Sequence, residues 1–248
     1  DETDQDFRVE MRGNGKTEPD FHAARIALDR RVQEFLDARE IDDLVEDLVD
    51  LALAQARSEI DAGTEAARLA AARREALEAL VADLRTVLEL DDIVICDVGA
   101  HKMWMARMFR CEQPNTCIIS NGFASMGIAV PGAIAAKLVS PDRAVVAVTG
   151  DAGFLMNSQE IETAMRLGIP IVILIWNDGG YGLIEWKQLN QFKRVSHVDF
   201  TNPDFVTYAQ AFGATGYRVD GPGQLQEILK DALAQPTVTI IDCPVDYS

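Results

Sequence analysis

The sequence lacks several features that mark common classes of protein. Its four cysteines include no Cys-x-x-Cys pair, so they match neither a zinc site nor a disulfide framework. We read them as free thiols in a reducing compartment. The amino-terminal residues do not show the charged and then apolar pattern of a signal peptide. No apolar run approaches the ~20 residues that a membrane span needs. We therefore expect a soluble, cytoplasmic protein.

Positive charge is also scarce. The 248 residues contain 23 lysines and arginines against 40 aspartates and glutamates, for a formal net charge of −17. Such a chain repels nucleic acid and anionic membranes, so we expect neither as a partner. A phosphate-bearing ligand would be repelled too, unless a divalent cation lay between it and the protein. Hydrophobic residues make up 48% of the chain, as in globular proteins.

The first 84 residues differ in character from the rest. Residues 1–19 are polar and contain glycine and proline, which predicts a flexible lead-in. Residues 20–84 are rich in good helix formers. Their apolar side chains recur at helical spacing, and one such run spans residues 66–88. We expect a helical segment that packs on itself or on a neighbour, and we find no chemistry in it.

From residue 85 onward the pattern changes to short runs rich in β-branched residues. Four of these runs are nearly unbroken, as in strands that are buried on both faces of a parallel sheet. They span residues 93–98, 144–150, 170–177 and 237–244. Helical stretches separate them, at residues 122–139, 157–167, 203–212 and 223–234. This alternation predicts a doubly wound, mostly parallel α/β domain over residues 85–248, preceded by the helical segment.

Glycines and aspartates follow three of the predicted strands. Ligands of such folds bind at the carboxyl ends of the strands, so these positions are candidates for a site. They read Gly99-Ala100-His101, Gly150-Asp151-Ala152-Gly153 and Asn177-Asp178-Gly179-Gly180. Glycine lets the backbone approach a phosphate closely, and the start of a helix offers free N–H groups.

Asp151 and Asp178 are the two carboxylates among these positions. They stand 27 residues apart, about one strand–helix–strand unit, which brings neighbouring strand ends together. Magnesium commonly takes one or two carboxylates together with substrate phosphates, and a carbonyl of the Gly179-Gly180 turn could be a further ligand. The alternatives are a helix N-cap for Asp151 and ordinary turn chemistry around Asp178.

Several segments resemble thiamine-diphosphate enzymes, and more narrowly acetolactate synthases. The stretch GDAGFLMNSQEIETAMRLGIPIVILIWNDGGYG resembles the thiamine-diphosphate motif. The segments DVGAHKMWMAR (97–107), SNGFASMGIAVPGAIAAK (120–137) and NPDFVTYAQAFGATGYRV (202–219) resemble acetolactate synthases in the same order. Asp178, where many relatives have asparagine, resembles the catabolic, FAD-independent type. The resemblance covers about residues 85–248.

The resemblance implies that the cofactors are thiamine diphosphate and Mg²⁺. It implies that pyruvate is decarboxylated and joined to a second pyruvate, giving 2-acetolactate. The implied metal ligands are Asp151, Asp178 and the carbonyl of Gly180. The other implied cofactor contacts are Gly99, Ala100, His101, Ala124, Met126, Gly150, Ala152, Gly153, Tyr181, Gly182 and Leu183.

Two of these residues have specific implied roles. Met126 would wedge the cofactor into its bent form, and the carbonyl of Ala124 would receive the aminopyrimidine. The alternatives are an ordinary core methionine at Met126 and an exposed loop histidine at His101.

The resemblance also implies a second, pyrimidine-binding domain, whose glutamate activates the cofactor. Residues 1–84 contain no recognisable domain of that kind. We therefore expect half of an active site, completed in a homo-oligomer or by a pyrimidine-domain partner, with weak or no activity from this chain alone. A fragment, a subunit of a split enzyme and an assembly domain all remain open. The alternative functions are another thiamine-dependent 2-oxo acid decarboxylase or carboligase, and a non-catalytic assembly protein.

Overall fold

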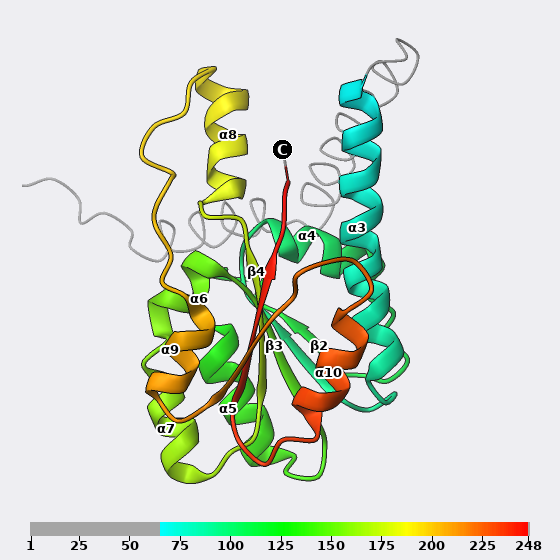
Figure 1. The fold of residues 1–248 in the computed structure, drawn as a ribbon, viewed down its shortest axis with the longest axis vertical. Helices are drawn as coiled ribbons and strands as arrows, with labels where there is room; N and C mark the ends of the chain where they lie inside the picture. The colour runs from blue at the N-terminus through cyan, green and yellow to red at the C-terminus, as the bar shows by residue number, and fades with distance from the viewer. Residues whose placement is uncertain (1–64, 248) are drawn as a thin grey trace, which may run out of the picture. The chain divides into compact units, whose positions relative to one another are not determined.

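The computed structural model describes residues 65–247, which form a parallel sheet with helices on both faces (Figure 1). The strands are β1 (Ile93–Cys96), β2 (Cys117–Ile119), β3 (Val145–Gly150), β4 (Val172–Asn177), β5 (Thr215–Arg218) and β6 (Thr239–Pro244). The helices are α3 (Glu65–Val87), α4 (Ala100–Met108), α5 (Ala129–Val139), α6 (Asp151–Asn157), α7 (Glu160–Leu167), α8 (Gly182–Phe192), α9 (Phe205–Ala211) and α10 (Leu225–Leu233). The expectations for residues 1–64 lie outside the described residues.

The sheet has six strands in the order β2-β1-β3-β4-β6-β5, and every neighbouring pair is parallel. The chain moves outward from β1 to β2 and then returns to the other side of β1 to form β3. The strand order therefore reverses between β1 and β3. Ligands of doubly wound sheets bind in the crevice outside the carboxyl ends of the strands at such a point. The predicted doubly wound parallel fold is confirmed.

Alternate residues of each strand face two separate hydrophobic layers. Ile93 and Ile95 of β1 pack in one layer with α5, α6, α7 and α9. Val94 and Cys96 pack in the other with α3, α4 and α10. Both layers are apolar because helices cover both faces of the sheet. The four uninterrupted apolar runs in the sequence follow from this three-layer arrangement.

Helix α3 belongs to the second layer of the α/β core. Its side chains Leu77, Val81 and Leu84 are buried there, and Gln226 of α10 donates a hydrogen bond to Asp83 over 2.7 Å. The helix predicted over residues 66–88 is confirmed. The boundary suggested by the sequence after residue 84 thus falls inside a helix that covers the sheet.

Several elements differ from the sequence expectation. The edge strands β2 and β5 and the helices α4 and α8 were not predicted. The helix predicted from residue 122 begins only at Ala129, because a turn with positive φ at Ala124 and Gly127 precedes it. The helix predicted over 157–167 is α7, which begins at Glu160, and a separate helix, α6, precedes it over Asp151–Asn157.

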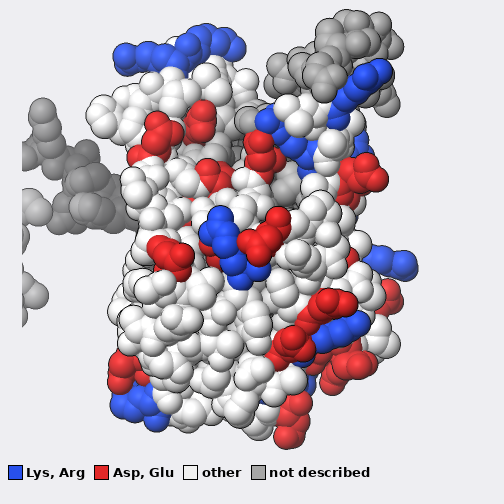
Figure 2. All heavy atoms as spheres, in the orientation of Figure 1, with Lys and Arg blue, Asp and Glu red and all other residues white. Residues whose placement is uncertain are grey.

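On the face drawn in Figure 2, acidic and basic side chains are interspersed. Within residues 65–247, every helix is too short or too polar to cross a bilayer.

Candidate functional site

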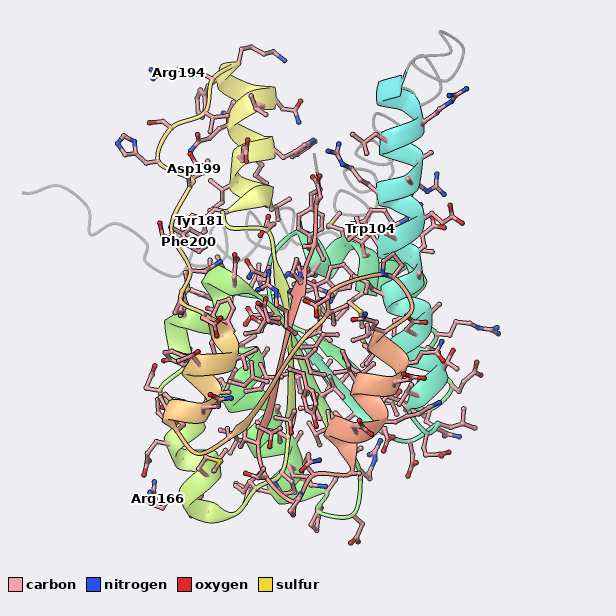
Figure 3. All side chains as sticks on the ribbon, viewed as in Figure 1. Trp104, Arg166, Tyr181, Arg194, Asp199 and Phe200 are labelled. Atoms are coloured by element: carbon pink, nitrogen blue, oxygen red, sulfur yellow. The ribbon has the colours of Figure 1, made fainter. Side chains whose placement is uncertain are left out.

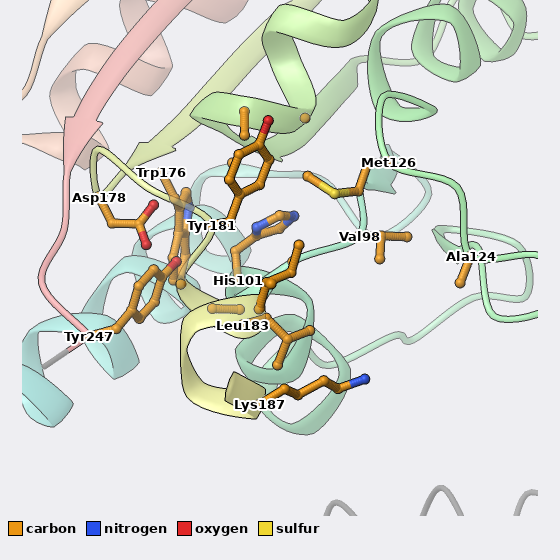
Figure 4. A pocket seen from close by; sticks show the side chains of 17 residues that line it. Val98, His101, Ala124, Met126, Trp176, Asp178, Tyr181, Leu183, Lys187 and Tyr247 are labelled. Carbon is orange, nitrogen blue, oxygen red and sulfur yellow. The ribbon is translucent and has the colours of Figure 1, made fainter. Parts of the chain in front are cut away.

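A cavity of about 230 Å³ lies at the carboxyl ends of β1, β3 and β4 (Figure 4). Its walls come from the segments that follow these strands, from the turn before α5, from α8 and from the carboxyl-terminal segment. The lining residues are Val98, Gly99, Ala100, His101, Ala124, Met126, Gly150, Ala152, Gly153, Trp176, Asp178, Tyr181, Gly182, Leu183, Ile184, Lys187 and Tyr247. All the candidate residues from the sequence line this cavity except Asp151 and Gly180.

Asp151 lies at the start of α6 and is buried, with 1% of its surface exposed. Its Oδ1 accepts a hydrogen bond from the Ala152 N–H over 2.7 Å. Its Oδ2 accepts two, from the Gly179 N–H over 2.8 Å and from Asn202 Nδ2 over 2.6 Å. Gly150 occupies the N-cap position of α6, so the N-cap alternative for Asp151 does not hold. The carboxylate is instead fixed between the ends of β3 and β4.

Asp178 follows β4 and faces the same region as Asp151. Burial and the neighbouring Asp151 carboxylate raise the pKa of Asp178 from 3.8 to about 7. Two carboxylates this close repel each other, and a divalent cation between them would reverse the sign of that interaction. A β-carbon at Gly182 would lie 2.6 Å from Asp178 Oδ2, so only glycine fits there without a shift. The pair fits a metal better than it fits a metal-free site.

The described residues offer few charged ligands for such a metal. Among the described residues there is no group of three or more His, Cys, Asp and Glu side chains that could hold a metal ion. Two carboxylates are a small set for Mg²⁺, which prefers six oxygen ligands. The remaining ligands would have to be backbone carbonyls, water or oxygens of a bound ligand. The two carboxylates alone therefore do not complete the coordination of such a metal.

The turn after β4 is held by the segment at residues 198–200. The Tyr181 N–H donates to the Val198 carbonyl over 2.9 Å, and the ring of Tyr181 packs against Phe200 at 5.1 Å between centroids (Figure 3). Gly179 has φ of 71°, a value that favours glycine. The segment thus forms a turn, which is compatible with either interpretation of Asp178, and the turn fixes the position of Gly180, whose carbonyl is a predicted metal ligand.

His101 lies in the first turn of α4 and is 2% exposed, so the exposed-loop alternative is wrong. A β-carbon at Gly99 would lie 2.7 Å from its Cε1, and one at Gly150 would lie 3.4 Å from it. These glycines therefore make room for the imidazole. Within residues 65–247 its Nε2 has no hydrogen-bond partner. Burial lowers the pKa of His101 to about 4, against a hydrogen bond with the Asp97 backbone, so a neutral ring stands at the cavity.

The buried His101 predicts a specific loss of stability in acid. The pKa of His101 is about 4 in the folded chain against 6.5 for an unperturbed histidine, so the unfolded state binds more protons between these pH values. Stability therefore falls as the pH drops below 6.5. Between pH 7 and 5, wild type should lose about 2 kcal/mol more than His101→Asn. Urea unfolding of both chains at the two pH values measures this. Equal losses would contradict a neutral buried His101.

Asp97 is a site residue that the sequence reasoning missed. It follows β1 and is fully buried. Its carboxylate accepts hydrogen bonds from the backbone N–H groups of Val98 (2.7 Å), Gly127 (2.9 Å) and Ala129 (3.2 Å), and from Thr149 Oγ1 (3.3 Å). It thereby joins the ends of β1 and β3 to the turn that carries Met126 and Ala124. Its sequence signal was a carboxylate at the end of a buried strand.

Tyr247 was also missed, because it lies beyond the last predicted strand. Its ring stacks on Trp176 at 6.5 Å between centroids. Its hydroxyl is buried and has no partner among the described residues. Burial and the nearby carboxylates of Asp178 and Asp151 raise the pKa of Tyr247 well above its ordinary value. The phenol therefore stays protonated, and its hydroxyl is a hydrogen-bond donor that the described residues leave unused.

Comparison with known proteins gives a consistent picture. Residues 97–243 match the family described as thiamine pyrophosphate enzyme, C-terminal TPP binding domain. The acetolactate synthase of Bacillus subtilis (strain 168) is 47% identical over 169 residues, which is 68% of this chain and 30% of that protein. The catabolic acetolactate synthase of Raoultella terrigena is 41% identical over 170 residues, 66% of this chain and 30% of that protein. The chain thus spans about 30% of the length of these curated relatives.

Proposed function

Because this chain belongs to the family of thiamine pyrophosphate enzyme C-terminal TPP-binding domains, we propose that the cavity binds the diphosphate of thiamine diphosphate together with Mg²⁺. The observation that carries the proposal is the pair Asp151 and Asp178 at the ends of the adjacent strands β3 and β4. A chain of net charge −17 needs a cation at this point to hold a diphosphate.

Each part of the cavity has a role in this proposal. Asp151, Asp178 and the Gly180 carbonyl hold the metal. His101 Nε2 is a buried, unpaired group that a phosphate oxygen or a metal-bound water can satisfy. Gly99, Ala100, Gly150, Ala152 and Gly153 line the same cavity with backbone and small side chains, which would let a diphosphate approach the main chain closely.

In this proposal the remaining predicted residues contact the organic part of the cofactor. Met126 and Ala124 stand on the turn that Asp97 fixes, and Met126 gives this wall an apolar surface. Tyr181, Gly182 and Leu183 line the cavity at the start of α8. When bound, the cofactor supplies the carbon centre at which a 2-oxo acid is decarboxylated and joined to a second one.

The whole reaction that we propose is that of acetolactate synthase, which forms 2-acetolactate from pyruvate. The two relatives described above carry this name. The activating glutamate is not among the residues of the cavity. We propose that a pyrimidine-binding domain supplies it, in a homo-oligomer or in a partner protein. The four free cysteines favour a reducing, cytoplasmic setting.

Isothermal titration of the full chain with thiamine diphosphate, with Mg²⁺ and with a chelator, tests the proposal. We expect binding that requires the metal, because only the cation offsets the repulsion between the diphosphate and the two carboxylates. A folded chain that does not bind, or that binds equally well in chelator, would contradict it. Acetolactate production from pyruvate by this chain alone should be weak or absent. A yield that matches a complete enzyme would overturn the assignment of the glutamate to another domain.

A further inference from the structure

A line of hydrogen bonds runs from the surface of the sheet to Asp151. Arg218 Nη1 of β5 forms an ion pair with Asp242 Oδ2 of β6 at 2.5 Å. Asp242 Oδ1 accepts a hydrogen bond from Asn177 Nδ2 over 2.9 Å. Asn177 Oδ1 accepts one from Asn202 Nδ2 over 2.9 Å, and the same Nδ2 donates to Asp151 Oδ2 over 2.6 Å. The line links three strand ends with the loop before α9.

Asn202 is the link that touches Asp151 directly. Its Nδ2 lies between two acceptors, Asp151 Oδ2 and Asn177 Oδ1. Reversing the amide would place its oxygen against both, so electrostatics fixes its orientation. Asp151 Oδ2 thereby accepts two hydrogen bonds, whereas Oδ1 accepts one. A carboxylate oxygen with a single donor keeps lone-pair capacity for a cation.

The outer end of the line keeps Asn177 and Asn202 in place. Asp242 is 1% exposed, and burying a carboxylate is costly unless a counter-charge or hydrogen bonds stabilise it. Arg218 supplies the charge, and Asn177 occupies the other oxygen. Asn177 is thus held at its Nδ2, which leaves its oxygen directed to Asn202.

We propose that Asn202 is a positioning residue, which fixes the Asp151 carboxylate so that Oδ1 is presented to the metal. The Arg218–Asp242 pair supports it through Asn177. This inference rests on the proposed function, since it assumes that Asp151 is a ligand of Mg²⁺. Asn202 itself need not touch the metal.

Metal selectivity separates this role from a merely structural one. Mg²⁺ demands near-octahedral geometry, whereas Ca²⁺ accepts flexible and varied coordination. Loss of the hydrogen bond from Asn202 to Asp151 should therefore weaken the binding of Mg²⁺ more than the binding of Ca²⁺. We expect Asn202→Ala to weaken Mg²⁺-supported binding of thiamine diphosphate about 10–100-fold, as for other groups that orient metal ligands. Binding supported by Ca²⁺ should fall much less. Titration calorimetry of the full chain with each metal measures both, and circular dichroism checks the fold.

Two further variants support the comparison. Asp204, two residues along, caps α9 by accepting the Thr207 N–H over 2.6 Å, and it forms no part of the line. Asp204→Ala should weaken the same loop and helix while leaving both metal affinities unchanged. Asn202→Ser keeps a small polar group that is too short to replace the amide. It should reproduce the loss of Mg²⁺ affinity if the alanine variant fails to fold.

The outcomes separate the two proposals. If wild type shows Mg²⁺-dependent binding and Asn202→Ala matches its affinity, the positioning role is wrong and the proposed function stands. If the Mg²⁺ and Ca²⁺ affinities fall equally, Asn202 serves the fold and does not orient Asp151. A folded wild type that binds no thiamine diphosphate with either metal overturns both proposals.

Discussion

Replacing Asp151 with alanine is expected to reduce Mg²⁺-dependent binding of thiamine diphosphate by roughly a hundredfold or more, beyond the effect of groups that only orient ligands. The described residues offer the metal two carboxylates and no larger acidic group, so this change removes half of the charged ligand set. Asp178→Ala should have an effect of the same kind. Calorimetry at a fixed pH, with Mg²⁺ and with chelator, gives the metal-dependent part of the affinity.

Glu185→Gln is the matched control for this prediction. Glu185 lies in the first turn of α8, and its charge contributes to the raised pKa of Asp178. The control thus removes one negative charge near the site while leaving both proposed ligands in place. We expect it to retain Mg²⁺-dependent binding. If Asp151→Ala also retained it, Asp151 would not be a metal ligand and the line through Asn202 would serve only the fold.

Replacing Asp97 with alanine should have the largest effect on stability among the site variants. The change leaves the backbone N–H groups of Val98, Gly127 and Ala129 without their buried acceptor, whereas the Thr149 hydroxyl can still donate to the Gly150 carbonyl at 2.9 Å. Each unsatisfied buried donor costs ~1–3 kcal/mol, so we expect a loss of about 3–5 kcal/mol, with some donors finding water. Urea unfolding measures this. The turn at Gly127 loses its anchor as well, so binding of thiamine diphosphate should weaken with it.

Asp92 provides the control at the other end of the same strand. It is 7% exposed and accepts the N–H groups of Ala144 and Glu89 at 2.9 and 2.8 Å. Asp92→Ala should also destabilise the chain, yet it lies away from the cavity and should leave the affinity for the cofactor unchanged. If folded Asp97→Ala bound as tightly as Asp92→Ala, Asp97 would not be needed to shape the cavity.

The sequence predicted those strands that are completely buried. The four runs that became β1, β3, β4 and β6 are apolar on both faces, because helices cover both sides of the sheet. The strand ends gave Asp151, Asp178 and the glycines beside them, because neighbouring parallel strands end together, whereas Ala124 and Met126 were implied only by the family resemblance. The edge strands β2 and β5 escaped notice since they are short and partly exposed. At an edge, the pattern of burial is too weak to read.

Two site residues could not be predicted from the sequence, for a different reason. Asp97 acts on Gly127 and Thr149, 30 and 52 positions away, and Asn202 acts on Asp151 across 51 positions. No local pattern encodes such contacts, because the partners meet only when the strands are side by side. Two glycines have a further role that no local pattern reveals. Gly99 and Gly150 looked like phosphate-binding positions, whereas they also leave space for the imidazole of His101.

The parallel sheet has a consequence for how the cavity comes into being. None of its neighbouring strands is joined by a hairpin, so every pairing closes a loop that contains at least one other element. Such non-local pairings make folding slow and cooperative. The walls of the cavity belong to five separate stretches of chain and therefore cannot assemble before the central strands have docked. A molecule that fills the cavity will bind only the folded chain, and it will raise the melting temperature of the sheet as a whole.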